Sequence, residues 1–79
     1  MEKENQKAIL VELGQIIKKL RLKQGISQEE LAERASVHRT YIGMIERGEK
    51  NLTVTTIIKI AQALNIKSSV LLEGINDGK

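Results

Sequence analysis

Two short apolar blocks near the middle of the chain are separated by only about three residues, and each block opens with a helix-start signal. In this signal an apolar residue precedes a cap position, and a second apolar residue follows four positions after the cap. The caps and the apolar residues that follow them are Ser27 with Leu31 and His38 with Ile42. Glu30 is expected to complete a capping box with Ser27. Because so short a connection fixes the crossing angle of two helices, the sequence predicts a rigid corner whose apolar sides face each other.

An apolar stripe marks a further helix before this corner. Its members recur at steps of three and four residues, as on one face of a helix: Leu10, Leu13, Ile17 and Leu20. The helix is expected from about residue 6 to residue 24, with Gly25 placed to end it and a frayed polar tail before it. Pro is absent and strand-like alternation never persists, so the sequence predicts an all-α fold.

Start and exit signals divide the rest of the chain. Helices are expected to begin near Gln28, Arg39 and Val54. Their exits are expected at Ser36, Gly48 and Asn65, and a short fifth helix over about 68–73 is closed by Gly74. Ser36 stands where such turns often use Gly. We therefore predict one domain over residues 1–79, a compact five-helix bundle with a helix-turn-helix at about 28–47.

Composition narrows the classes of function. The chain has 13 Lys and Arg against 10 Asp and Glu, and a net charge of +3 permits nucleic-acid binding without requiring it. Tyr41 is the only aromatic residue, so the stacking platforms of single-strand and RNA readers cannot be built. Cys is absent and the single His cannot form a metal site alone, so no metal or other cofactor is expected. Without an apolar signal segment or membrane span, the chain is expected to be cytoplasmic, with no membrane partner.

The outer side of the third expected helix has the composition of a contact surface. With Ile42 and Ile45 inward, the outward residues are Arg39, Thr40, Gly43, Met44 and Arg47. Gly43 costs about 1 kcal/mol relative to Ala inside a helix, and Met44 exposes apolar surface, which indicates that a partner approaches closely. If the helix enters the major groove of duplex DNA, Arg39 meets guanine and Thr40 meets a base edge or a thymine methyl. The alternative for Arg39 is a solvated surface side chain.

A second set of residues is expected at the DNA backbone, each with an ordinary alternative. Tyr41 would donate its hydroxyl to a phosphate, or pack half-buried. Gln28 would bind a phosphate at the start of the second helix, or stay an exposed polar residue. His38 would contact a phosphate or a base, or be a surface residue. Lys50 and Asn51, in the loop after the third helix, would reach the backbone or be only solvated.

The C-terminal segment, at about 66–76, holds more apolar residues than one short helix can bury in a small domain. Leu71 and Leu72 are expected in the core. The candidates for an interface with a second copy are Val70 and Ile75, with Ile58 on the fourth helix. A twofold dimer places its two recognition helices about 34 Å apart, one turn of DNA, and so predicts a pseudo-palindromic operator.

The chain resembles the Xre/Cro/CI class of helix-turn-helix regulators, which are phage-repressor-like, over about residues 13–72. The most specific part is ISQEELAERASV followed by YIGMIERGEKN. The stretch HRTYIGMIERGEKN is most similar to the controller proteins of restriction-modification systems. In these proteins the residues matching Arg39 and Thr40 read bases, and those matching Tyr41, Lys50 and Asn51 lie at or near the DNA backbone.

The resemblance implies a five-helix, lambda-repressor-like domain and a twofold dimer. It also implies an ion pair at the positions of Arg21 and Glu46, whose opposite charges next to core positions already suggest a link between the first and third helices. Two departures stand out, because Ser36 replaces the usual turn Gly and His38 stands where controllers often have Asp. Base contacts at the start of the third helix are therefore expected to differ from those of relatives.

These inferences favour a dimeric, sequence-specific regulator of duplex DNA. The resemblance further implies that it binds at its own operon, as the controller proteins of restriction-modification systems do, with RNA polymerase as a further partner that it positions or blocks. The alternatives are a phage- or Xre-type repressor of other genes, and an antitoxin-like module that covers a protein partner. An enzyme is not expected. The chain has no Cys nucleophile or glycine-rich phosphate loop, and its paired acids, Glu29 and Glu30, are neighbours at a capped helix start.

Overall fold

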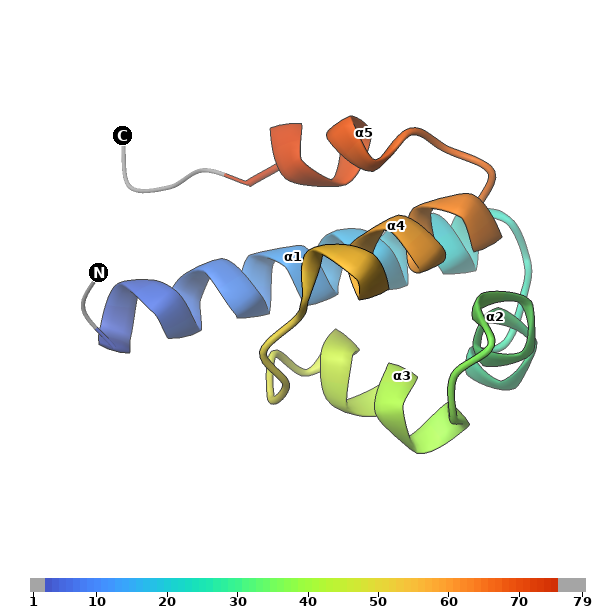
Figure 1. Ribbon diagram of the computed structural model, residues 1–79, viewed down its shortest axis with the longest axis horizontal. Helices are drawn as coiled ribbons and strands as arrows, with labels where there is room; N and C mark the ends of the chain where they lie inside the picture. Colours follow the sequence, from blue (N-terminus) through green and yellow to red (C-terminus); the bar gives the residue numbers. More distant parts are fainter. Residues whose placement is uncertain (1–2, 76–79) are drawn as a thin grey trace.

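The computed structural model describes residues 3–75 as a bundle of α-helices joined by short loops (Figure 1). The five helices of this described part are α1 (Lys3–Lys23), α2 (Gln28–Ala35), α3 (Arg39–Glu46), α4 (Val54–Ala63) and α5 (Ser68–Glu73). In Figure 1, α5 lies along one side of α1 and α4, and the corner of α2 and α3 lies on the other side. The predicted all-α class and the order of helices are confirmed. No helix over residues 3–75 is both long and apolar enough to cross a bilayer.

One apolar core joins the helices. Its fully buried large side chains are Ile17, Leu31, Ile42, Ile45, Ile60, Leu64 and Leu71. Burial of each such side chain stabilises the folded state by roughly 1.5–3 kcal/mol. The packing of this core therefore takes the place of the disulfide or metal that a short chain often uses. The prediction that Leu72 belongs to the core is wrong, because Leu71 points inward and the side chain of Leu72, one residue along the helix, is 50% exposed.

The helix boundaries follow the predicted signals with one difference at the N-terminus. Left-handed backbone occurs at four of the five expected exits, with φ of 72° at Gly25, 59° at Ser36, 74° at Gly48 and 59° at Asn65. Gly74 ends α5 with right-handed backbone, at φ of −73°. However, α1 begins at Lys3, so the frayed tail expected up to about residue 5 is helical from residue 3 onward. Glu, Lys and Gln are good helix formers, and without Gly or Pro nothing in this segment stops the helix.

The corner between α2 and α3 is closed by backbone hydrogen bonds. Ser36 has φ of 59° and ψ of 43°, and the N–H of Val37 donates to the carbonyl of Ala32 over 2.9 Å. This conformation costs Ser roughly 1 kcal/mol, and it lets α3 turn back against α2 within three residues. His38 is the N-cap residue of α3, although its side chain makes no cap hydrogen bond.

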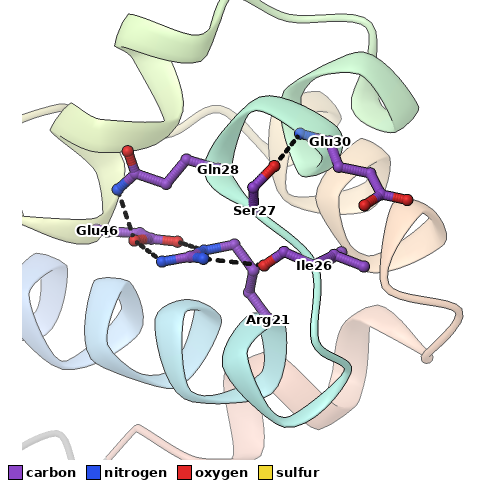
Figure 2. A network of polar contacts seen from close by, with 6 residues as sticks. All are labelled: Arg21, Ile26, Ser27, Gln28, Glu30 and Glu46. Atoms are coloured by element: carbon purple, nitrogen blue, oxygen red, sulfur yellow. Dashed lines mark hydrogen bonds and ion pairs between the residues drawn. The ribbon is translucent and has the colours of Figure 1, made fainter.

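The capping box predicted at the start of α2 is only half formed (Figure 2). The Oγ of Ser27 accepts a hydrogen bond from the N–H of Glu30 over 3.0 Å. The carboxylate of Glu30 does not return to the backbone of Ser27, because it pairs instead with Arg34, one turn later, over 2.7 Å. The Glu30 carboxylate therefore pairs with an Arg one turn along the helix and not with the backbone N–H of Ser27.

Two glycines allow α1 to cross the end of α3 closely. A Cβ added to Gly14 of α1 would lie 2.7 Å from the carbonyl oxygen of Glu46 and would also meet that of Ile45. A Cβ added to Gly48 would lie 2.7–2.9 Å from Val11. Real Cβ atoms do not approach this closely, so each position requires Gly and the backbones of α1 and the α3 exit lie in direct contact.

Candidate nucleic-acid interface

The outward side of α3 carries the polar residues that the sequence analysis placed there. Ile42 and Ile45 are buried, whereas the side chains of Arg39, Thr40 and Arg47 are exposed. Met44 is half-buried between the two sides. The first turn of α3, and Arg47 directly after its last residue, therefore project away from the core, as predicted.

Gly43 is the exception, because it is buried and not exposed as expected. A Cβ added there would lie 3.2 Å from the NH1 nitrogen of Arg47 and 3.8 Å from the Oε1 oxygen of Gln28. The missing side chain thus leaves a notch in the outer side of α3, and the ends of two long side chains cover it. A direct DNA contact by Gly43 would require these side chains to move, so its predicted exposure is corrected.

A buried ion pair ties α3 to α1 (Figure 2). The Nε of Arg21 donates to Oε2 of Glu46 over 2.7 Å, and its NH2 donates to Oε1 over 3.1 Å. Its NH1 donates to the carbonyl of Ile26 over 3.0 Å. With their backbone atoms included, Arg21 is 6% exposed and Glu46 is 7% exposed. The predicted pairing is confirmed, and its two-pronged geometry fixes the orientation of α3 as well as its position.

Gln28 completes this network and is the main surprise among the expected site residues. Its Nε2 donates to Oε1 of Glu46 over 3.0 Å, so the side chain turns inward to α3. The amide nitrogen that was expected to bind phosphate is already engaged, which leaves the backbone at the start of α2 for that role. No local pattern indicates the contact, because it depends on where the corner places two residues that are 18 positions apart.

The loop after α3 gathers opposite charges. The Nε of Arg47 lies 3.1 Å from Oε2 of Glu49, and both side chains are about half exposed, at 58% and 47%. The hydrogen bond from Arg47 holds the pKa of the Glu49 carboxyl below its ordinary value of 4.5, and the charges of Arg47 and Lys7 add to this effect. The Nζ of Lys50 lies 5.8 Å from the centre of the half-buried Tyr41 ring, at cation–π distance. Asn51 is exposed beside it.

The backbone of this loop is held in place from both sides. The Nζ of Lys7, on α1, donates to the carbonyl of Gly48 over 2.9 Å. The N–H of Glu49 donates to the carbonyl of Met44 over 2.8 Å. Lys7 was not among the predicted site residues, because a contact between residues 41 positions apart leaves no trace in helical periodicity. Lys50 and Asn51, which are expected to contact the DNA backbone, therefore lie on a loop whose own backbone is held in place.

His38 and Arg39 border a shallow hollow at the start of α3. Its other lining residues come mostly from α2 and include three carboxylates, those of Glu29, Glu30 and Glu33. His38 and Arg39 are both exposed. Arg39 therefore stands between an acidic side of α2 and the outward side of α3, and its guanidinium is free to turn toward a ligand.

The apolar residues expected at a dimer interface are distributed over two sites. Ile58 is 41% exposed and Val70 is 43% exposed, as the interface hypothesis requires. Ile75 is half-buried and, with Leu72, lines an apolar cavity of about 250 Å³ against α1. Val54, 72% exposed on the same helix as Ile58, is a further candidate that the sequence analysis missed. Residue 76, the expected end of the interface segment, lies outside the described residues.

Comparisons with known proteins agree with this geometry. The helix-turn-helix family matches residues 17–71. The control protein C.SmaI of Serratia marcescens is 45% identical over 60 residues, which are 76% of this chain and 71% of that protein. The crystal structure of the restriction-modification controller protein C.AhdI from Aeromonas hydrophila has 42% identity and a TM-score of 0.77, and the match covers 78% of this chain and 94% of that one. The controller C.Esp1396I, solved as a tetramer in complex with its natural 35 base-pair operator, has 38% identity and a TM-score of 0.77 over 82% of this chain and 86% of that one.

Proposed function

This chain belongs to the helix-turn-helix family of transcription regulators, and on that premise we propose that it is the controller protein of a restriction-modification system. It binds duplex DNA at its own operon as a homodimer. The observation that carries the proposal is the outward side of α3, where Arg39 and Thr40 are exposed on a helix whose end is locked by the Arg21–Glu46 pair. Such a helix presents its polar side chains to a groove from a fixed backbone, so that only the side chains remain to be ordered on binding.

The residues divide into two roles at the DNA. In the major groove, Arg39 offers its planar fork to guanine, Thr40 reaches a base edge, and Met44 contacts a thymine methyl. Around the groove, phosphates are contacted by a second set of residues, comprising Tyr41, Lys50, Asn51, His38 and the backbone at Gln28. The first set chooses the sequence, and the second set provides affinity and orientation.

A twofold dimer sets the form of the operator. Two copies of α3 about 34 Å apart meet two half-sites one turn of DNA apart, so the operator is a pseudo-palindrome. The exposed Ile58 and Val70, on α4 and α5, are the proposed contact between copies, together with Ile75. A dimer bound at its own promoter positions or blocks RNA polymerase in the cytoplasm, and this role needs no catalysis. The C.Esp1396I complex is a tetramer on one operator, and we extend that assembly to two dimers of this chain.

A binding titration tests the proposal. The purified protein is mixed with the duplex upstream of its own coding sequence and with a shuffled duplex of equal length, at several salt concentrations. We expect the upstream duplex to bind at least 10³-fold more tightly at physiological salt, as specific regulators do. Equal affinity for both duplexes at every salt concentration would contradict the proposal.

Two substitutions test the division of roles. Arg39→Ala should reduce operator affinity by about 1–3 kcal/mol and relax the preference at one base pair of each half-site. Lys50→Ala should weaken binding to the upstream and shuffled duplexes alike, with a shallower salt dependence. If Arg39→Ala instead weakens both duplexes equally, Arg39 is not a base-reading residue.

A further inference from the structure

A carboxylate lies among the residues that the proposed function places against DNA. Glu49 follows α3 by three positions, between Arg47 and Lys50, and its side chain is 47% exposed. A negative charge facing a phosphate backbone opposes binding unless a positive charge compensates it. Here the compensating group is Arg47, whose Nε lies 3.1 Å from the Glu49 carboxylate.

The loop holds this carboxylate where it meets Arg47. The N–H of Glu49 is bonded to the carbonyl of Met44, and the carbonyl of Gly48 accepts from Lys7 of α1. Gly48 itself lies in backbone contact with Val11. With its backbone fixed on both sides, Glu49 remains within reach of Arg47 in the absence of DNA.

The other end of the Arg47 side chain is also held close to the helix. Its NH1 nitrogen covers the notch at Gly43, at 3.2 Å from the position that a Cβ would take. The guanidinium thus lies back along the outer side of α3, with Nε toward Glu49 and NH1 over Gly43. An Arg in this position does not extend toward a phosphate or a base.

We propose that Glu49 is a specificity-determining residue, which withholds Arg47 from DNA until a matching operator offers a better partner. The inference rests on the proposed function and deepens it. An exposed ion pair between flexible side chains is weak, whereas a two-pronged contact of Arg with guanine discriminates by roughly 5- to 150-fold. A fitted operator therefore displaces Glu49, and a loosely bound random duplex, repelled by the same carboxylate, does not. The ordinary alternative is that the pair only orders the loop.

Salt dependence separates these two roles, because each phosphate neutralised by Lys or Arg steepens the slope of log K against log salt by about 0.9. In Glu49→Gln, Arg47 is released to bind a phosphate of any duplex. We expect the slope on a shuffled duplex to steepen by about 0.9. The affinity of the variant relative to the wild-type protein should then rise by about fivefold when the salt concentration is lowered from 1 M to 0.15 M. The gain on the upstream duplex is smaller, so the ratio of the two affinities falls.

Matched variants control for charge and for the role of Arg47. Glu73→Gln removes the same charge from α5, which packs on α1 and α4 away from α3, and should leave the slope unchanged. When Arg47 is already Ala, Glu49→Gln should steepen the slope less, because it then removes a repulsive charge without releasing a cation. Thermal unfolding of each variant confirms that the protein tested is folded.

The outcomes distinguish this inference from the proposed function. An unchanged slope on the shuffled duplex, or the same change in Glu73→Gln, overturns the withholding of Arg47. A steeper slope with an unchanged ratio of affinities overturns the role in specificity. The proposed function fails by a different result, in which the wild-type protein binds the upstream and shuffled duplexes equally.

Discussion

Two ion pairs begin at neighbouring residues, Glu46 at the end of α3 and Arg47 directly after it, and behave in opposite ways. Glu46 turns inward to Arg21, and both side chains are almost fully buried, at 2% and 8% exposure. Arg47 turns outward to Glu49, with about half of each side chain in solvent. Their closest N–O distances, 2.7 Å and 3.1 Å, differ little. Surroundings, and not distance, therefore decide what each pair does.

The charges of the buried pair cannot exchange their partners, whereas those of the exposed pair can. Arg21 also binds the carbonyl of Ile26, and Glu46 also accepts from Gln28, so the charges have partners beyond each other. Among the described residues, no buried side-chain nitrogen or oxygen lacks a hydrogen bond. A closed network inside the protein resists exchange, because removing one member leaves a charge without solvent. The exposed pair can exchange its partner for water, phosphate or a base.

Arg21→Ala should produce the largest effect and break the inward side of the comparison. It leaves Glu46 buried without its counter-charge, and the free energy of unfolding should fall by about 3–5 kcal/mol, as measured by urea denaturation. Arg34→Ala, which removes a half-exposed partner from Glu30, is the matched control and should change stability by less than about 1 kcal/mol. Similar losses for the two variants would contradict the distinction drawn from burial.

Arg47→Ala should affect DNA binding and leave stability nearly unchanged. We expect the affinity for the upstream duplex to fall by about tenfold, in the range of a lost Arg contact. The affinity for a shuffled duplex should fall less, because there only the counter-charge of Glu49 is lost. Fluorescence anisotropy on both duplexes measures this difference. A large loss of thermal stability would show instead that the outward pair is structural.

Gln28→Ala should sharpen the comparison by opening the buried network at its edge. Glu46 keeps Arg21 and loses one hydrogen bond, so the free energy of unfolding should fall by about 1 kcal/mol. Gln62→Ala, at an exposed position of α4, is the control and should be close to neutral. If both variants behave alike, the Gln28–Glu46 contact does not stabilise the corner.

The titration of Glu49 should give the smallest effect. Its carboxyl should titrate below 4.5 in NMR spectra, because the hydrogen bond from Arg47 lowers its pKa, and in Arg47→Ala the midpoint should move back toward 4.5. Since the folded pKa is the lower one, any stabilisation from this pair is present above about pH 4.5 and is lost as the pH falls through the lowered pKa. Arg34→Ala should leave the midpoint where it is.

Local signals predicted the fold well because its elements are set by neighbours in sequence. The Oγ of Ser27 accepts a hydrogen bond from the N–H of Glu30, and this cap was recognisable from its spacing to apolar residues. Thr53 accepts in the same way from Thr56, directly before the helix start that was expected near Val54. Charge and position next to the core were also enough to pair Arg21 with Glu46. What such signals give is the start, the end and the inward side of each helix.

The predictions that were wrong concern residues whose surroundings are set by the tertiary arrangement. Gln28 bonds to Glu46 and not to solvent, and Gly43 is covered by Arg47, because the tertiary arrangement brings these groups together. Leu72 was expected inside, yet a short helix against one small core can bury only one side. The contact of Lys7 with Gly48 depends on the crossing of α1 and α3. None of these outcomes follows from periodicity.

The absence of a side chain at Gly14 has a consequence for redesign. Since α1 meets the carbonyls at the end of α3 directly, the angle at which α3 is held depends on this main-chain contact and on the inward Arg21–Glu46 pair, and not on the identity of the outward side chains. New residues at the positions of Arg39, Thr40 and Met44 can therefore be screened without a change in the orientation of α3. A library of variants that keeps Gly14 should retain this orientation, and a library that varies Gly14 should contain fewer members that retain it.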